Sequence, residues 1–555
     1  MRYNKYYFLL LLTIIVGTTA CKKQLDVKNP NSPSVEDLLT EPGVTALAKG
    51  AVYQNGLNLA FNAGLNQLGS GFSYTVYGYQ ELLADNISAS ASNQNINVIN
   101  LPDYVTLDDG TKRSSGISQR NTIRSTNDRA KRSSNSIYYE WAYMYAMNEA
   151  CNNILNILPR VKFYAGDSVS KARTVEAWCY FWKGYAYSRI GSMYYAGIIN
   201  DASYNSFAQG QTNNHYVTHE AMIVEANKNL DKAMTALSGI TTSADYSSIL
   251  SQIIPDFIGA NGLHGGTPSI LGFQHSINTM KARNILANKL VTAMTVADWN
   301  NILTLTANGL TNSDKAFTVQ TTDDNNVLSP TGNLAYLSRT TAGTFKISER
   351  LTQEYKAGDK RFANNFSTRA TTYIDATGGI TTNSRYALRN GGAGIAGTIT
   401  YLNSTAGFQE IYVGPSYEEN ALMRAEALIY TGKADAGLAL VDAVRNYQGA
   451  GLVAASGTGL TQAQAVTELR RERRVALFLR GTAFYDYRRW GIIYDVSKGG
   501  GRSGAVVISQ SSTGAIVVNT NAFINYNFLD YWDVPADESD VNVPDATSAP
   551  VINPG

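Results

Sequence analysis

A glycine-rich stretch near the N-terminus concentrates side chains that suit the binding of a polyhydroxylated ring. The segment 68–100 contains the aromatics Phe72, Tyr74, Tyr77 and Tyr79, followed by Asp85 and Asn86. A tyrosine offers a flat apolar face and a hydroxyl, which match the face and the hydroxyls of a sugar. Gly69, Gly71 and Gly78 disfavour a helix here. We therefore expect a loop in which at least one of these three tyrosines stacks on a sugar, while Asp85 and Asn86 bind ring hydroxyls.

Further aromatic candidates fall in polar stretches downstream. The chain has 35 Tyr against 17 Phe, an excess of the aromatic residue that carries a hydroxyl. The tyrosines in expected loops are Tyr336, Tyr373, Tyr386 and Tyr401. Core packing is the alternative role for every one of these side chains, because a tyrosine also suits the protein interior. The predicted ligand-binding set is Tyr74, Tyr77, Tyr79, Asp85, Asn86, Tyr336, Tyr373 and Tyr386.

Motifs of catalysis and of cofactor binding are missing from the sequence. It contains no Gly-x-Ser-x-Gly and no His-Glu-x-x-His. The glycine run 499–501 is not followed by Lys and Ser or Thr, as a phosphate-binding loop requires. His215 and His219 have no thiol or acidic partner at ligand spacing. Carboxylates are plentiful, but no pair stands out as a glycosidase acid pair, so we expect no catalytic residue, cofactor or metal.

The composition describes a folded chain with balanced charge. The 555 residues are 44% hydrophobic and 16% charged, as in ordinary globular proteins. The sequence has 46 basic and 44 acidic residues, and two of the basic ones, Arg2 and Lys5, precede Cys21. The remainder is neutral, which argues against a nucleic acid as the main partner and against purely electrostatic membrane attachment.

The N-terminus predicts export and a lipid anchor. Arg2 and Lys5 precede an apolar run, 8–16, that is too short to span a membrane and suits a secretory signal. Residues with small side chains, 17–20, then precede Cys21, as in a bacterial lipobox, although Thr18 stands where leucine is usual. We predict a signal peptide over 1–20, a lipidated Cys21 and a tether to residue 33. The alternative is a plain signal peptide with an incidental cysteine.

The other two cysteines, Cys151 and Cys179, lie on expected helices among apolar neighbours. In an exported protein they can form a disulfide, because that compartment is oxidising. The alternative is that both are small buried hydrophobic side chains. The sequence leaves this choice open.

Hydrophobic periodicity predicts one mainly α-helical domain over 34–555. Helices are expected at 34–53, 137–158, 173–195, 218–237 and 416–446, with a hairpin at 281–310 that breaks near Thr295. The pair 417–445 has about the length of a tetratricopeptide unit. Stretches rich in Gly, Thr, Ser and Asn, at about 240–281 and 368–409, are expected loop insertions, and 498–520 is an expected hairpin or ordered loop.

The most distinctive stretch is 460–491, LTQAQAVTELRRERRVALFLRGTAFYDYRRWG. Thr461 and Gln464 predict a capping box at the start of an amphipathic helix, and Gly481 a suitable end for it. The stretch resembles the C-terminal signature of the SusD/RagB family of nutrient-binding outer-membrane lipoproteins. The matching residues are Glu472, Arg473, Arg474, Gly481, Asp486, Arg488, Arg489, Trp490 and Gly491.

The resemblance extends along the chain, with departures. Asp85-Asn86, Asp359-Lys360-Arg361 and the segments 141–158, 424–428 and 532–555 also look like family patterns. The family usually has Glu where Ala476 and Arg480 stand, and Arg where Ala483 stands, which indicates a missing ion-pair network. We expect Asp486, Arg488, Arg489 and Trp490 to be structural, with their charges buried and paired.

The resemblance implies a fold of tetratricopeptide-like helical hairpins with a looped face and minor β-hairpins. It implies the capture, without catalysis, of an oligosaccharide or sometimes a peptide at the cell surface. The implied partners are that ligand, the outer membrane through the lipid anchor and a SusC-like TonB-dependent transporter. Two other classes remain open, namely an exported helical scaffold that binds only proteins and an exported glycoside hydrolase.

Overall fold

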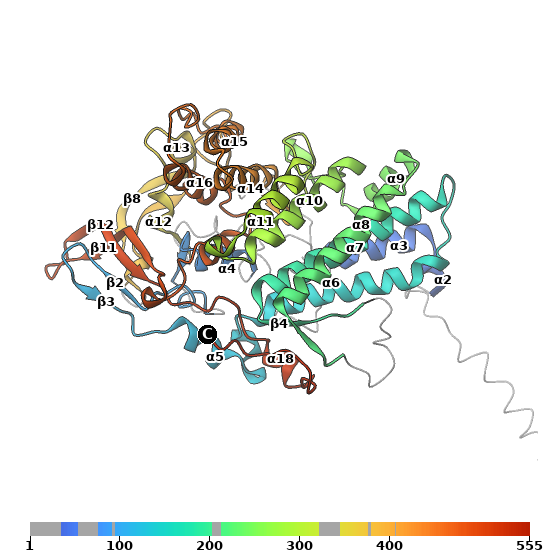
Figure 1. Ribbon diagram of the computed structural model, residues 1–555, viewed down its shortest axis with the longest axis horizontal. Coiled ribbons are helices and arrows are strands. Elements are labelled where there is room, and N and C mark those ends of the chain that lie inside the picture. Colours follow the sequence, from blue (N-terminus) through green and yellow to red (C-terminus); the bar gives the residue numbers. More distant parts are fainter. Residues whose placement is uncertain are drawn as a thin grey trace, which may run out of the picture.

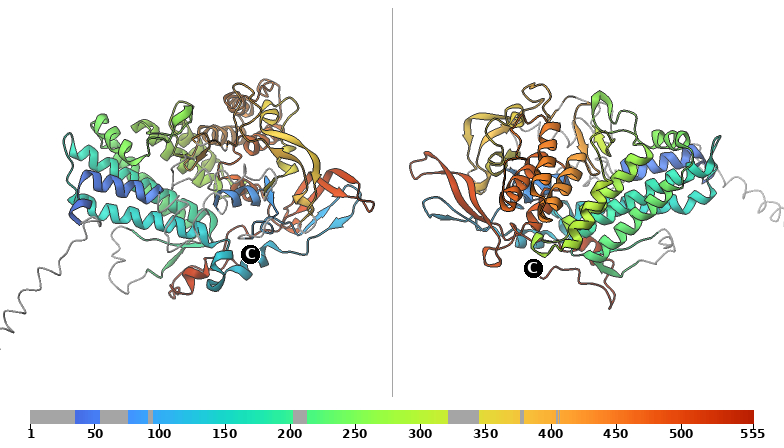
Figure 2. Two further views of the ribbon diagram at one scale, coloured as in Figure 1. Left: turned by 180° about the vertical axis from the view of Figure 1, so that it is seen from behind. Right: turned by 45° about the horizontal axis from the view of Figure 1, so that its top comes forward.

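The molecule is elongated, with helices along most of its length and strands gathered at one end (Figure 1). The computed structural model describes residues 35–53, 76–90, 95–201, 213–320, 345–375, 379–403, 405 and 407–555. Both views in Figure 2 keep the strand-rich end next to the C-terminal helices.

The first group of helices surrounds one long buried helix, α7. The group consists of α2 (Val35–Leu38), α3 (Glu41–Tyr53), α6 (Tyr138–Ile157), α7 (Ser168–Met193), α8 (His219–Ser238) and α9 (Ser243–Ile253). Because α3, α6, α8 and α9 all pack against α7, its C-terminal half is buried, and Trp178 and Trp182 are both fully buried. The hydroxyl of Thr218 caps α8, as the sequence predicts.

The second group continues the row with antiparallel hairpins. It consists of α10 (Ile270–Ala287), α11 (Val296–Ala307), α14 (Tyr417–Tyr430), α15 (Ala434–Tyr447) and α16 (Gln462–Ala476). Small residues let α14 and α15 approach closely, since a Cβ on Gly437 would lie 2.6 Å from the Ala425 carbonyl oxygen. The predicted capping box of Thr461 and Gln464 is present on α16. The prediction of a mainly α fold of tetratricopeptide-like hairpins is confirmed.

The strands form small antiparallel sheets. A four-stranded sheet has the order β11 (Arg502–Gln510), β12 (Ile516–Asn525), β2 (Tyr104–Thr106) and β3 (Lys112–Arg113). A hairpin of β8 (Phe366–Tyr373) and β9 (Ser384–Leu388) lies at the same end. The remaining pairs are β1 (Ile87–Ala89) with β7 (Phe345–Ile347), β6 (Thr318–Gln320) with β10 (Glu410–Tyr412), and β4 (Ala196–Ile198) with β5 (Tyr216–Thr218).

Short helices connect these parts. They are α4 (Gly78–Leu83), α5 (Gln119–Thr126), α12 (Glu349–Thr352), α13 (Lys360–Asn365), α17 (Ala483–Arg489) and α18 (Ala536–Ser539). The 3-10 turns are η4 (Arg129–Ser134), η5 (Leu158–Arg160), η6 (Ala260–Gly262), η7 (Val291–Ala293), η9 (Ile380–Thr382) and η10 (Val496–Lys498). Within the part of the chain described, no helix is long and apolar enough to cross a membrane.

Three sequence expectations differ from the structure. Residues 240–281 are not a loop insertion, because they hold α9 and most of α10, both packed on α7. Gly78 does not prevent a helix, because the backbone is already helical at Tyr77 and continues into α4. The helix expected to end at Gly481 ends at Ala476, and Gly481 instead precedes a second helix, α17.

Cys151 on α6 and Cys179 on α7 are both free and fully buried. Burial raises the pKa of the Cys179 thiol well above its ordinary value, and the neighbouring Cys151 adds to this effect. In this structure the two cysteines are therefore small buried side chains, the second of the two alternatives.

Candidate ligand-binding site

The C-terminal signature lies inside the protein, where its charges pair with one another. Asp486 on α17 accepts hydrogen bonds from Arg473 at 2.9 Å and from Arg489 at 2.7 Å. Arg489 also donates to both oxygens of Glu426 on α14. Arg488 donates to backbone carbonyls, including that of Ser192 at 2.7 Å. These contacts confirm the expectation that the signature charges are buried and paired, and they join α17 to α14 and α16.

Arg480, a departure from the family pattern, has its own partners. Its guanidinium contacts Glu418 at 3.2 Å and lies 3.6 Å from the ring centroid of Tyr412. The charge of Glu418 outweighs burial and raises the pKa of Arg480. An arginine at this position of the signature therefore pairs with a glutamate on α14.

The early aromatic stretch packs into the core where the structure describes it. Tyr77 is 5% exposed and Tyr79 is 1% exposed. The Tyr77 hydroxyl donates to the carbonyl of Val413 at 3.3 Å, and the Tyr79 ring packs edge-on against Trp532 at 5.7 Å between centroids. Neither ring is placed to stack on a ligand from solvent, so core packing, the alternative role, describes both. Phe72 and Tyr74 lie outside the described residues.

Asp85 and Asn86 are buried and are engaged by distant parts of the chain. Asp85 accepts hydrogen bonds from Arg350 and from Ser348 and Tyr526, all at 2.7 to 2.9 Å. Burial raises the pKa of Asp85, but the Arg350 charge outweighs it and the net shift is downward. Asn86 donates to Glu81 at 2.7 Å and accepts from Arg474 at 2.8 Å. Their observed role is to hold α12 and α16 in place.

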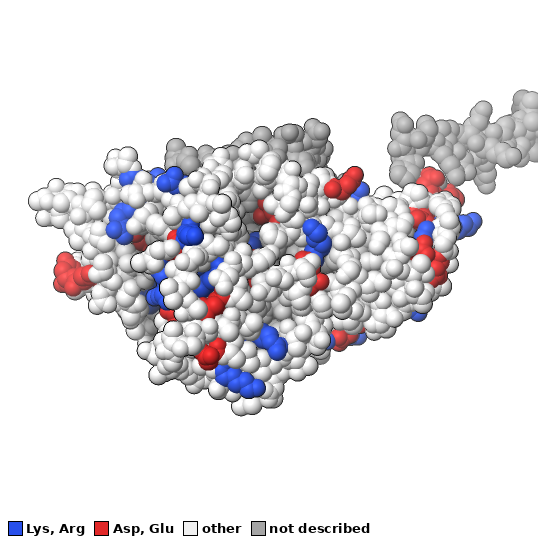
Figure 3. Space-filling view, turned by 90° about the horizontal axis from the view of Figure 1, so that it is seen from above, with Lys and Arg blue, Asp and Glu red and all other residues white. Residues whose placement is uncertain are grey.

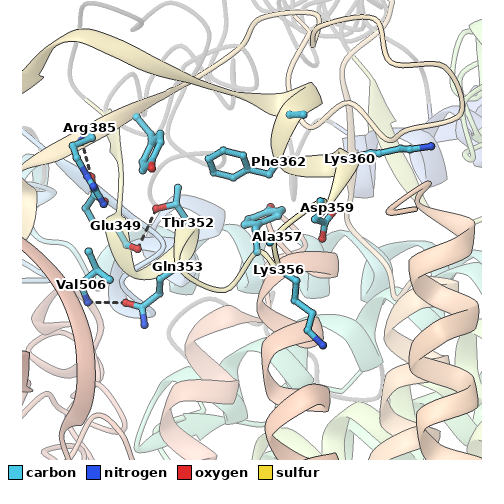
Figure 4. Close-up of a pocket in the computed structure, with 14 residues that line it drawn as sticks. Glu349, Thr352, Gln353, Lys356, Ala357, Asp359, Lys360, Phe362, Arg385 and Val506 are labelled. Carbon is cyan, nitrogen blue, oxygen red and sulfur yellow. Dashed lines mark hydrogen bonds and ion pairs between the residues drawn. The ribbon is translucent and has the colours of Figure 1, made fainter. Parts of the chain in front are cut away.

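A pocket with a volume of about 440 Å³ lies between α12, α13, β9 and β11. Its lining includes Tyr386, Phe362, Tyr355, Gln353, Thr352 and Lys356. The rings of Phe362 and Tyr386 meet edge to face, with centroids 5.4 Å apart. Figure 4 shows Phe362 at the centre, Glu349 and Arg385 on one side, and Asp359 and Lys360 on the other. This aromatic wall is the arrangement that suits stacking against a sugar ring.

Asp359-Lys360-Arg361 builds the rim of this pocket. Asp359 caps α13 by accepting from the backbone N–H of Arg361 at 2.9 Å. The Arg361 side chain bonds both Asp359 and Glu472 of α16, at 2.8 Å and 2.6 Å. Glu472 and Asp359 outweigh burial and raise the pKa of Arg361. The C-terminal signature thereby fixes α13, and with it the position of Phe362.

The other predicted tyrosines are distributed around this pocket or away from it. Tyr386 is half-buried and lines it, and its role in ligand binding stays a prediction. Tyr373 lies on the same hairpin, with the Lys346 ammonium 4.5 Å from its ring centroid. Tyr401 is buried and accepts a hydrogen bond from Tyr355 at 3.1 Å. Tyr336 lies outside the described residues. Sequence reasoning missed Phe362, Arg385 and Lys360, although Lys360 belongs to a motif that it singled out.

A second pocket of about 280 Å³ opens beside the four-stranded sheet. Arg113, Ser114, Ser115 and Gln510 line it, and it contains no aromatic residue. Among the described residues no group of three His, Cys, Asp or Glu side chains is arranged to hold a metal ion. Basic and acidic side chains are interspersed over the face seen in Figure 3. The first pocket is therefore the candidate site with aromatic character.

The structure defines a helical-hairpin protein with an aromatic pocket, and comparisons with known proteins show what it is similar to. Residues 417–550 match the model of the SusD family. A SusD-like carbohydrate binding protein from Bacteroides vulgatus ATCC 8482 has 12% identity and a TM-score of 0.55, over 92% of this chain and 98% of that one. A SusD-like carbohydrate binding protein from Bacteroides fragilis NCTC 9343 has 13% identity and a TM-score of 0.51, over 90% and 97%.

A further SusD-like protein from Bacteroides fragilis NCTC 9343 has 14% identity and a TM-score of 0.51, over 85% of this chain and 93% of that one. At such identities the likeness shows a shared fold. No curated protein matches the chain in sequence. The family match over residues 417–550 and the fold shared with these structures agree with the resemblance of the chain to the SusD/RagB family.

Proposed function

We propose that this chain is a lipid-anchored, non-catalytic glycan-binding protein of the outer membrane. It captures an oligosaccharide and delivers it to a SusC-like TonB-dependent transporter. The observation that carries the binding role is the pocket of about 440 Å³ whose wall is formed by Tyr386 and Phe362. Two solved structures of the same fold are those of SusD-like carbohydrate binding proteins, which supports a glycan as the ligand.

The carboxylates around the pocket favour binding over hydrolysis. A glycosidase needs two carboxyl groups, one of which donates a proton to the leaving group. Glu349 accepts hydrogen bonds from Arg385 at 2.7 Å, and Asp359 accepts from Arg361 at 2.8 Å. Both carboxylates are therefore held by arginine side chains of the protein, and neither is left free to act on a substrate. We infer that a bound glycan leaves the pocket intact.

The anchor and the transporter enter this proposal through the lipobox-like segment ending at Cys21 and through the resemblance to the SusD/RagB family. In Figure 1 the first described helix, α2, lies at one end of the long axis, and the pocket helices α12 and α13 lie toward the other. With this separation, the N-terminal end can lie at the membrane while the pocket at the other end binds a glycan.

Calorimetry on the purified mature chain tests the binding role. Tyr386→Ala should weaken the binding of the glycan about fivefold, since an aromatic contact contributes about 1 kcal/mol. Tyr164→Ala is a matched control, because Tyr164 is 54% exposed and lies on the loop before α7, outside the pocket lining. Chromatography of the recovered glycan should show no shortened product.

Two outcomes would overturn the proposal. Shortened glycan products would identify a hydrolase. Failure of the wild-type chain to bind any member of a broad glycan array, together with binding to protein partners, would identify a scaffold. Unchanged affinity in folded Tyr386→Ala would move the site away from this pocket.

A further inference from the structure

We propose that the pocket selects glycans that carry an anionic substituent, a carboxylate or a sulfate ester. The inference rests on the proposed function, because it names the class of glycan that the same site takes. The volume and the aromatic wall suit any sugar ring. Discrimination between charged and neutral sugars must therefore come from the polar groups around that wall.

Most polar groups of the pocket are already occupied by the protein itself. The Gln353 amide donates to the Gly504 carbonyl at 3.1 Å and accepts from the Val506 N–H at 2.8 Å. The Thr352 hydroxyl donates to the Glu349 carbonyl at 3.1 Å. Neutral sugars are recognised by carboxylates and amides with free hydrogen-bonding capacity, because sugar hydroxyls both donate and accept. Here the amide and the two carboxylates, Glu349 and Asp359, are committed elsewhere.

The side chain at the pocket that remains free to bind a ligand group through its charge is a cation, Lys360. Lys360 is exposed at the rim, and within the described part of the chain its ammonium has no acidic partner. Figure 4 shows this ammonium directed outward from Phe362, where a group extending past the rim would meet it. The stem of Lys360 lies against Gly451, where a Cβ would approach its Cε to 2.8 Å. That contact holds the charge at the rim.

Two arginines lie on or beside the β8–β9 hairpin, outside the pocket lining. Arg369 donates to the Tyr386 carbonyl at 2.9 Å, and Arg389 donates to the Phe366 carbonyl at 2.9 Å. Neither forms an ion pair with an acidic side chain among the described residues. Burial lowers the pKa of Arg369, which is the expected effect on a cation that lacks a neutralising partner.

The pocket lining has a small excess of basic side chains. It carries Lys356, Lys360 and Arg385 against Glu349 and Asp359. A concave site with an excess of one sign raises the local concentration of ligands of the opposite sign. Guanidinium and ammonium groups also form their strongest hydrogen bonds with oxyanions. A ring stacked on Tyr386 with a carboxylate or sulfate near Lys360 would satisfy both requirements.

A matched pair of ligands tests the inference directly. On an array of neutral, uronate-containing and sulfated glycans, the mature chain should bind the uronate-containing or sulfated members. The affinity for the best binder is then compared with that for its neutral form, obtained by carboxyl reduction for a uronate or by desulfation for a sulfate ester. The acidic form should bind at least tenfold more tightly, and added salt should narrow the difference.

Lys360→Gln should reduce the ratio of acidic to neutral affinity about tenfold, the scale of one charge-assisted hydrogen bond. Lys433→Gln removes the same charge from an exposed position before α15 and should leave the ratio unchanged. Equal affinity for the acidic and neutral forms, with dependence on Tyr386, would overturn the acidic preference but leave the proposed function standing. Absence of binding to every glycan would overturn both.

Discussion

At the scale of single residues, buried charges are matched against each other along the C-terminal signature. Arg361, Asp359 and Glu472 form one group, and Asp486, Arg473 and Arg489 form another. A buried ion has lost its water shell, so the partners that replace water determine whether it is tolerated. Substitution of one member therefore affects stability through the charge that is left behind.

Asp486→Ala should lower the free energy of unfolding by about 3–5 kcal/mol, because Arg473 loses its partner and Arg489 keeps only Glu426. Urea denaturation monitored by circular dichroism measures this change. Asp540→Ala is the control, since Asp540 is exposed. An Asp486→Ala protein of wild-type stability that had lost glycan binding would contradict the structural role of the signature.

Glu81 should make the protein less stable as the pH rises toward neutrality. Burial raises the pKa of Glu81 from 4.5 to about 7, despite hydrogen bonds from Asn86 and Leu479. Between these two values the unfolded chain releases a proton that the folded chain retains, so stability falls by about 1.4 kcal/mol per pH unit. Glu81→Gln should flatten this slope between pH 5 and pH 7.

Denaturant titrations of wild type and variant at those two pH values isolate the contribution of Glu81, since every other group titrates in both proteins. Glu220→Gln, at a side chain that is 71% exposed, is the control. Equal slopes for wild type and Glu81→Gln would show that Glu81 is ionised in the folded protein at pH 5.

At the scale of elements, local sequence signals predicted the long helices well and the pocket poorly. Periodicity and caps such as Thr218 and Thr461 depend on residues within a few positions, and the structure confirms them. Tyr77 and Asp85 looked like ligand residues because their core partners, including Arg350 and Val413, are more than 250 residues away. The pocket joins residues 349–386 with Val506, and no local pattern indicates that meeting.

The turn between α16 and α17 depends on Gly481. Its φ is +68°, and a Cβ there would lie 2.3 Å from the Tyr77 ring. Gly481→Ala should lower the free energy of unfolding by more than about 1–2 kcal/mol, the cost of a left-handed backbone for a residue with a side chain, because the Tyr77 ring must also move. Gly499, with φ +81° and nothing within 4 Å of a Cβ, is the matched control. Urea midpoints that fall equally in the two alanine variants would show that the Tyr77 contact is unimportant.

At the scale of the whole molecule, the row of hairpins separates the N-terminal end from the pocket. The helices α2 and α3 lie at one end, and α12, α13 and the β8–β9 hairpin lie at the other (Figure 1). The C-terminal signature connects the two parts, since α17 packs on α4 and α10 while α16 fixes α13 through Glu472. Because the N-terminal end and the pocket lie far apart, we expect that the proposed glycan binding and the proposed membrane attachment can be changed independently.

Cys21→Ala should release the protein from membranes without changing its affinity for glycans. Several acyl chains make a lipid anchor durable, because each buried CH₂ contributes about 0.8 kcal/mol. Fractionation of cells that produce either form measures the release, and mass spectrometry of the wild-type N-terminus checks for acylated Cys21. Calorimetry should give the same glycan affinity for both forms, because the pocket is built entirely from residues between 349 and 506. An unmodified N-terminus at another residue would contradict the lipid anchor, and weaker binding by Cys21→Ala would show that the anchored end contributes to the site.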